Sequence, residues 1–184
     1  MSELVFLGFD VSSTGIGAAM LNEAGEILRT WVWQSDDPSE SERIWSIGKW
    51  AGRLNDSLIR EASGVLALSM EGPFVRGPGS RPLIRAQGAV MSRFQGDWRF
   101  YQPQAVKATA ARSGVQIPLE LEGKDRMVYA TRKQWTLGPV ATVWDPVQSP
   151  LVPHKAKAMG DLADALWVAE TDRKTCQQAR GMEN

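Results

Sequence analysis

The first 34 residues constrain the fold most, because their pattern predicts three consecutive strands joined by short turns. Leu4–Val11 is an almost continuous apolar run, which is typical of a buried strand, and turn-forming residues 12–15 end it. Segments 17–21 and 27–34 flank a short connection at 22–26 that contains a glycine, which is a hairpin pattern. The chain therefore opens with three antiparallel strands.

Helix and strand signals alternate in the rest of the chain. Apolar residues at spacings of three and four predict a helix from about 37 to 62, and a short buried strand at 65–70 then delivers Glu71 at its carboxyl end. Further helices are predicted at 83–98, 103–113, 124–135 and 155–171, and a further strand at 98–102. Three strands followed by alternating strands and helices predict an α/β fold, a mixed sheet covered by helices.

Length and composition limit the class of protein. The 184 residues fit one domain spanning 1–184, with a flexible tail at about 173–184. An apolar fraction of 43% and a charged fraction of 23% are ordinary for a globular protein. No run approaches the ~18 apolar residues of a membrane span. Residues 1–9 lack the basic start of a signal peptide, so we expect a cytoplasmic protein. The single cysteine, Cys176, excludes an internal disulfide and a cysteine zinc site.

The charges are unevenly distributed, although they sum to zero over the chain. Residues 1–71 carry 5 basic and 11 acidic side chains, residues 72–135 carry 11 and 4, and residues 136–184 carry 5 and 6. A basic middle segment between acidic ends is compatible with a local face that binds an anionic ligand. The alternative is that the helices simply have solvated basic faces.

Four acidic residues have positions that suggest a metal site. Asp10 ends the first strand and Glu71 ends the fourth, while Asp161 and Asp164 share one face of the last helix. If the two strands are neighbours and the helix crosses them, the four carboxylates converge. Carboxylates at close range repel one another and take up protons unless divalent cations lie between them. A set of oxygen ligands favours Mg²⁺ or Mn²⁺ over zinc.

Each of these acids also has an ordinary structural explanation. Asp10 could accept hydrogen bonds in the turn that follows it, from Ser12 or Thr14. Glu71 could be a surface charge, and the two helical aspartates could interact with the helix dipole. The metal-site hypothesis therefore depends on the four acids taken together.

Four sets of residues, in order along nearly the whole chain, resemble the motifs of RuvC-type Holliday-junction resolvases, which belong to the ribonuclease-H-like superfamily. They are Leu7–Gly17 (LGFDVSSTGIG), Met70–Phe74 (MEGPF), the basic segments Pro103–Lys107 and Gly123–Val128, and Asp161–Leu166. The resemblance implies a ribonuclease-H-like fold, with a mixed five-stranded sheet and helices on both faces.

The resemblance also implies an activity and a set of functional residues. The expected enzyme is a metal-dependent endodeoxyribonuclease that resolves four-way DNA junctions by paired symmetric nicks, using two Mg²⁺ or Mn²⁺ ions per active site. The residues that match catalytic and metal-binding positions are Asp10, Glu71, Asp161 and Asp164, with Lys124 as a further catalytic residue. The candidates for DNA contacts are Phe74, Arg76, Arg81, Arg85, Lys107, Arg112 and Lys124. Phe74 matches an aromatic residue that opens base pairs at the junction centre, where it would stack on an unpaired base.

A symmetric junction requires two cuts, and a twofold homodimer supplies two identical sites. We expect the helix at 83–98 to contribute to the dimer interface through Met91, Phe94 and Trp98. His154 is expected to be a surface or capping residue.

Three other functions stay open from the sequence. The first is a nuclease of the same fold that acts on other branched DNA or on RNA–DNA hybrids. The second is an actin-like or sugar-kinase-like ATP-binding protein, which residues 10–25 also resemble, although such proteins need two lobes. The third is a protein that binds a nucleic-acid structure without nuclease activity, although the presence of all four carboxylates argues against it.

Overall fold

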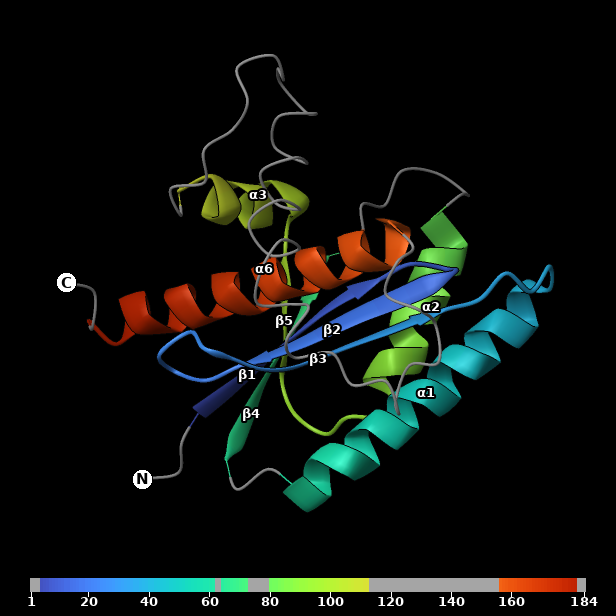
Figure 1. Cartoon of the computed structure of the whole chain (residues 1–184), viewed down its shortest axis with the longest axis horizontal. Coiled ribbons are helices and arrows are strands. Elements are labelled where there is room, and N and C mark those ends of the chain that lie inside the picture. Colours follow the sequence, from blue (N-terminus) through green and yellow to red (C-terminus); the bar gives the residue numbers. More distant parts are fainter. Residues whose placement is uncertain (1–3, 62–63, 73–79, 113–155, 182–184) are drawn as a thin grey trace, which may run out of the picture.

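The computed structural model describes residues 4–61, 64–72, 80–112 and 156–181, and these residues form a five-stranded mixed sheet with helices packed against it (Figure 1). The strands are β1 (Leu4–Val11), β2 (Gly15–Leu21), β3 (Ile27–Gln34), β4 (Val65–Glu71) and β5 (Trp98–Tyr101). Their order across the sheet is β3-β2-β1-β4-β5. The β1–β2 and β2–β3 pairs are antiparallel, while β4 runs parallel to both β1 and β5. The three antiparallel strands predicted at the start of the chain are confirmed.

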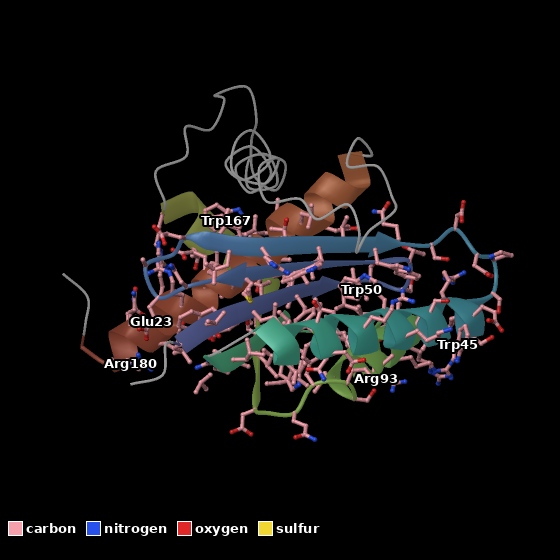
Figure 2. All side chains as sticks on the ribbon, turned by 60° about the horizontal axis from the view of Figure 1, so that its bottom comes forward. Glu23, Trp45, Trp50, Arg93, Trp167 and Arg180 are labelled. Atoms are coloured by element: carbon pink, nitrogen blue, oxygen red, sulfur yellow. The ribbon has the colours of Figure 1, made fainter. Side chains whose placement is uncertain are left out.

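Helices cover both faces of the sheet (Figures 1 and 2). The described helices are α1 (Glu40–Glu61), α2 (Arg81–Met91), α3 (Pro103–Arg112) and α6 (Ala156–Ala179). Residues of α1 and α2 form one apolar core with one face of the sheet, α6 forms a second core with the other face, and α3 packs against α6. The predicted α/β class, a mixed five-stranded sheet with helices on both faces, is confirmed.

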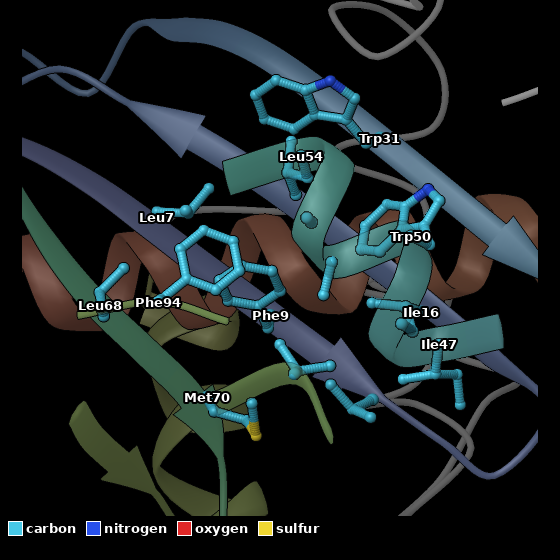
Figure 3. Close-up of a cluster of buried hydrophobic side chains, with 14 of the residues drawn as sticks. Leu7, Phe9, Ile16, Trp31, Ile47, Trp50, Leu54, Leu68, Met70 and Phe94 are labelled. Carbon is cyan, nitrogen blue, oxygen red and sulfur yellow. The ribbon is translucent and has the colours of Figure 1, made fainter. Parts of the chain in front are cut away.

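The side chains of β1 alternate between the two cores, as a strand buried on both faces requires. Leu7 and Phe9 contribute to the core beneath α1 and α2, which Figure 3 shows in close-up, while Phe6 contributes to the core beneath α6. The same alternation continues to the end of the strand and places Asp10 on the α6 face. The strand pattern therefore decides which face of the sheet receives the acid.

α2 ends earlier than the sequence predicted. The helix was expected to continue to residue 98, but it stops at Met91, and the chain then turns through Gly96, whose φ is 139°. Phe94 and Trp98 pack their rings against Phe9, with centroid distances of 5.3 and 5.4 Å. Phe94 is therefore part of the core of the subunit, and Trp98 packs against that core while partly buried. The dimer interface expected through Met91, Phe94 and Trp98 stays a prediction.

α6 continues further than predicted, to Ala179 instead of about residue 171. Part of the segment expected to be a flexible tail is thus helical. Arg173 binds Glu170 with Nε 2.7 Å from Oε2, and Arg180 binds Glu23 with Nη1 2.8 Å from Oε1. Within the described part of the chain, no helix is both long and apolar enough to cross a membrane. The helix predicted at 124–135 lies outside the described residues.

Candidate active site

Parallel pairing of β1 with β4 places Asp10 and Glu71 side by side. The register pairs Phe9 with Met70, so the next residue along each strand is an acid. Phe9 and Met70 both lie in the core beneath α1 and α2, and the acids that follow them therefore face α6. Backbone pairing of the two strands therefore explains why Asp10 and Glu71 lie close together.

Two glycines allow α6 to lie directly on β1 and β2. A Cβ atom at Gly8 would lie 2.4 Å from the backbone nitrogen of Ala169, and one at Gly17 would lie 2.1 Å from the backbone oxygen of Asp161. Any side chain at either position would therefore collide with the helix backbone. Because Gly17 pairs directly with Asp10, this contact places the start of the acidic helix segment beside Asp10.

Asp161 has a polar partner that the sequence did not indicate. Its Oδ2 atom accepts a hydrogen bond of 2.9 Å from Nε2 of Gln34, the last residue of β3. Sequence reasoning missed Gln34 because its contact with Asp161 spans 127 residues. Its position at the end of a strand is the one local signal that it shares with Asp10 and Glu71.

The electrostatics of Glu71 show that a second acid is close to it. Burial, followed by the negative charge of Asp164, raises the pKa of Glu71 from 4.5 to about 7, while the positive charge of Lys107 lowers it. The structure thus brings Asp164 of α6 and Lys107 of α3 to the end of β4. Lys107, which the resemblance proposed as a DNA contact, is close enough to act on the charge of the acidic cluster.

The end of β4 is held from the opposite face of the sheet. Gln87 of α2, which is 5% exposed, donates a hydrogen bond of 2.9 Å from Nε2 to the backbone oxygen of Glu71. The backbone nitrogen of Gly72 donates to the backbone oxygen of Tyr101 at 2.7 Å. Gln87 lies within the helix predicted at 83–98, and nothing in its sequence position indicates that it fixes the strand end.

The four acids have the chemistry that a divalent cation needs, but their side chains do not form a ready-made coordination site. Among residues 4–61, 64–72, 80–112 and 156–181, no three His, Cys, Asp or Glu side chains are close enough to form a metal-binding group. The four acids offer oxygen ligands, which Mg²⁺ and Mn²⁺ prefer. Burial and, after it, the negative charge of Asp164 raise the pKa of Glu71, and a divalent cation beside this carboxyl group would favour its ionised form. The donor set therefore fits the implied ion.

Comparison with known proteins identifies the fold. No protein-family model and no curated protein matches the sequence. Among solved structures, "T. thermophilus RuvC in complex with Holliday junction substrate" matches with a TM-score of 0.59 and 19% identity, over 97% of this chain and 97% of that chain. "Thermus thermophilus RuvC structure" matches with a TM-score of 0.55, at the same identity and coverage. This chain has the ribonuclease-H-like fold of RuvC. The resemblance inferred from the sequence motifs is thereby confirmed at the level of the fold.

Not all of the other predicted site residues lie near the acids. Arg85 of α2 donates from Nη1 to Oε1 of Glu40 at 3.0 Å, and both helices of this ion pair cover the face of the sheet opposite α6. Arg81 begins α2 and Arg112 ends α3, and both side chains are exposed. The remaining predicted residues, Lys124, Phe74, Arg76 and His154, lie outside the described part of the chain.

Proposed function

We propose that this protein is a metal-dependent endonuclease that cuts branched DNA, with the four-way junction as its preferred substrate. The observation that carries the proposal is the position of Glu71 near Asp164 on the α6 face of a RuvC-like fold, where burial and then the charge of Asp164 raise the pKa of Glu71. One of the matching RuvC structures is a complex with a Holliday junction, which supports branched DNA as the substrate class. The fold by itself does not select this substrate, since functional sites vary on a shared fold.

In this proposal, four carboxylates hold the metal ions, two per active site: Asp10, Glu71, Asp161 and Asp164. Bound Mg²⁺ or Mn²⁺ would supply an activated water and stabilise the leaving oxygen during hydrolysis of a phosphodiester. Lys107 offsets part of the negative charge at Glu71, so it keeps that carboxyl group closer to the ionised form that a cation binds. Lys124 is proposed to stabilise charge on the transferring phosphate, and Phe74 to stack on an unpaired base.

The central test is the substitution Asp10→Asn. The substitution removes the negative charge of a proposed metal ligand and leaves the basic residues intact. Loss of a residue that only supports a metal ligand costs up to about 100-fold in activity, and loss of the ligand itself should reduce cleavage by more than that. Binding to a synthetic four-way junction in EDTA should stay unchanged. The matched control is Asp56→Asn, which changes an exposed aspartate of α1 and should cleave normally.

The same assay can determine the substrate. Purified protein is incubated in Mg²⁺ with four-way junctions, flaps and RNA–DNA hybrids of equal length. Preference for the junction with paired symmetric nicks supports the proposal, whereas preference for hybrids or flaps assigns a different nuclease of the same fold. Full activity of Asp10→Asn would contradict the proposed site.

Paired nicks require two active sites, and we propose that a homodimer supplies them through the outer surface of α1 and α2. Trp45 of α1 is 60% exposed and Ile84 of α2 is 44% exposed, whereas Phe94 is buried and Trp98 is partly buried. Trp45→Glu should therefore produce a monomer that still folds, as measured by sedimentation equilibrium and circular dichroism. The control is Ile59→Glu, which changes another apolar residue of α1. Ile59 is 68% exposed but lies beside the opposite end of the sheet, so this substitution should leave the dimer intact. A dimeric Trp45→Glu protein would place the interface elsewhere.

A further inference from the structure

The carboxylate of Asp161 lies against two residues that pair directly across β2 and β3. Gly15 and Gln34 are partners in the β2–β3 register. Gln34 donates its hydrogen bond to Oδ2 of Asp161, and a Cβ atom at Gly15 would lie 3.0 Å from that same oxygen. It would also lie 3.3 Å from Cγ of Gln34. The missing side chain of Gly15 therefore leaves the space that the carboxylate occupies.

Different residues fix the backbone and the side chain of Asp161. Its backbone oxygen touches β2 at Gly17, as described above, so the position of this helix turn is set by the packing of α6 on the sheet. The direction of the carboxylate depends on torsions that this contact does not control. The hydrogen bond from Gln34 and the open space above Gly15 together favour one orientation of the Asp161 side chain.

The chemistry of the partner matters as much as its position. The amide of Gln34 is neutral, so it orients the carboxylate without cancelling its charge. An arginine or lysine at this position would form an ion pair and would compete with a bound cation. In metal sites, partners that hydrogen-bond to a ligating group fix its orientation, and their loss typically costs 10–100-fold in metal affinity or activity.

We propose that Gln34 and Gly15 are positioning residues that aim the carboxylate of Asp161 at a divalent cation. This inference rests on the proposed function, because it assumes that Asp161 is a metal ligand. It adds two residues whose contribution would pass through Asp161.

The test measures Mn²⁺ binding to the metal-free protein by titration calorimetry, without DNA. Two variants change the pair by different means. Gln34→Met keeps the length of the side chain and removes the donor, whereas Gly15→Ala fills the space under the carboxylate. Each should raise the Kd for Mn²⁺ by about 10-fold. The control Gln95→Met changes an exposed glutamine in the turn after α2 and should leave the Kd unchanged.

Two further measurements separate positioning from damage to the fold. Thermal unfolding in EDTA should give the same midpoint for Gln34→Met as for the wild type. In cleavage assays, the metal concentration that gives half the maximal rate should rise by the same factor as the Kd. The maximal rate itself should recover at saturating metal, which would not happen if the active site were generally disordered.

The outcomes distinguish this inference from the proposed function. If the wild type binds Mn²⁺ and both variants bind it equally well, the positioning role is wrong and the proposed function stands. Loss of affinity that appears only with a lower thermal midpoint also overturns the positioning role. A wild-type protein that binds no Mn²⁺ and cuts no DNA overturns the proposed function and this inference with it.

Discussion

α6 carries acidic side chains in both of its halves, and their surroundings differ. Asp161 and Asp164 in the first half are half-buried, whereas Asp172 in the second half is buried. In the second half, Asp172 is fully buried, and Arg99 of β5 binds it with Nε 2.7 Å from Oδ1 and Nη2 2.9 Å from Oδ2. The hydroxyl of Tyr101 donates a third bond, 2.7 Å from Oδ1. In the first half, Asp164 faces Glu71, which is another acid.

The difference shows which acids serve the fold and which are available for function. Burial raises the pKa of Asp172, and the hydrogen bond from Tyr101 and the charge of Arg99 oppose that rise in part, so the charge of this acid has direct partners. At Glu71 the cost of burial is increased by a negative neighbour, with Lys107 as an opposing charge. Uncompensated buried charge is costly, so proteins keep it where a ligand or an ion uses it.

The largest expected effect comes from breaking the compensated network. Arg99→Ala leaves Asp172 buried without its cation, which should destabilise the fold by about 3 kcal/mol, near the low end for such pairs because Arg99 is 41% exposed. Urea unfolding measures this loss, and the Kd for Mn²⁺ should stay unchanged. The control Arg180→Ala breaks an exposed pair with Glu23 and should cost less than about 1 kcal/mol. Equal losses in the two variants would remove the distinction between the two halves of α6.

Removing a charge from the acidic cluster should stabilise the protein, whereas Arg99→Ala should destabilise it. The pKa of Glu71 in the folded protein, about 7, is above its ordinary value of 4.5, so the folded state holds the proton more tightly. This contribution to stability is complete below pH 4.5 and is lost as the pH rises through about 7. Glu71→Gln should therefore stabilise the metal-free protein at pH 8 by on the order of 2 kcal/mol, after allowance for solvent screening.

Urea unfolding in EDTA at pH 5 and pH 8 measures this effect. The wild type should lose more stability between the two pH values than Glu71→Gln does, and Mg²⁺ should restore part of the loss in the wild type alone. The same pH dependence in both proteins would show that the charge of Glu71 is compensated after all.

The smallest effect is expected from Lys107→Met, which removes the positive charge that opposes the cluster. The carboxyl group of Glu71 should then be half-protonated at a pH above about 7, and stability should change by less than about 1 kcal/mol. Carboxyl carbon NMR during a pH titration measures the shift. Lys49→Met on α1, whose ammonium lies 4.1 Å from the centroid of the Trp45 ring, is the matched control and should leave Glu71 unchanged.

The local pattern predicted the strands better than it predicted the ends of the helices. The bounds of β1 and β3 agree with the prediction because apolar runs end at turn-forming residues. The end of α2 was not predictable in this way, since the apolar spacing continues through Phe94 while the backbone has already left the helix. α6 was predicted too short because the polar residues after 171 resemble a tail, and the contacts of Arg173 and Arg180 with the distant Glu23 are not visible in the sequence.

The sequence was enough to predict which acids are candidates for the site, but not which residues surround them. Strand ends and a spacing of three on a helix indicated Asp10, Glu71, Asp161 and Asp164 before any coordinates. The catalytic and metal-binding roles of these acids stay predictions. The structure adds their arrangement and the partners that the pattern missed, among them Gln34.

The sequence by itself determined the face on which each acid would lie, because the periods of strands and helices are local properties of the chain. Only the tertiary structure decided which acids of the chain have a cation as a direct partner. Desolvation and Coulomb interactions depend on distances through space, and here they join residues as far apart as Gln34 and Asp161. The buried carboxylate of Asp172 beside Arg99 therefore stabilises the fold, while the half-buried carboxyl group of Glu71 beside Asp164 is one that a cation could stabilise in its ionised form.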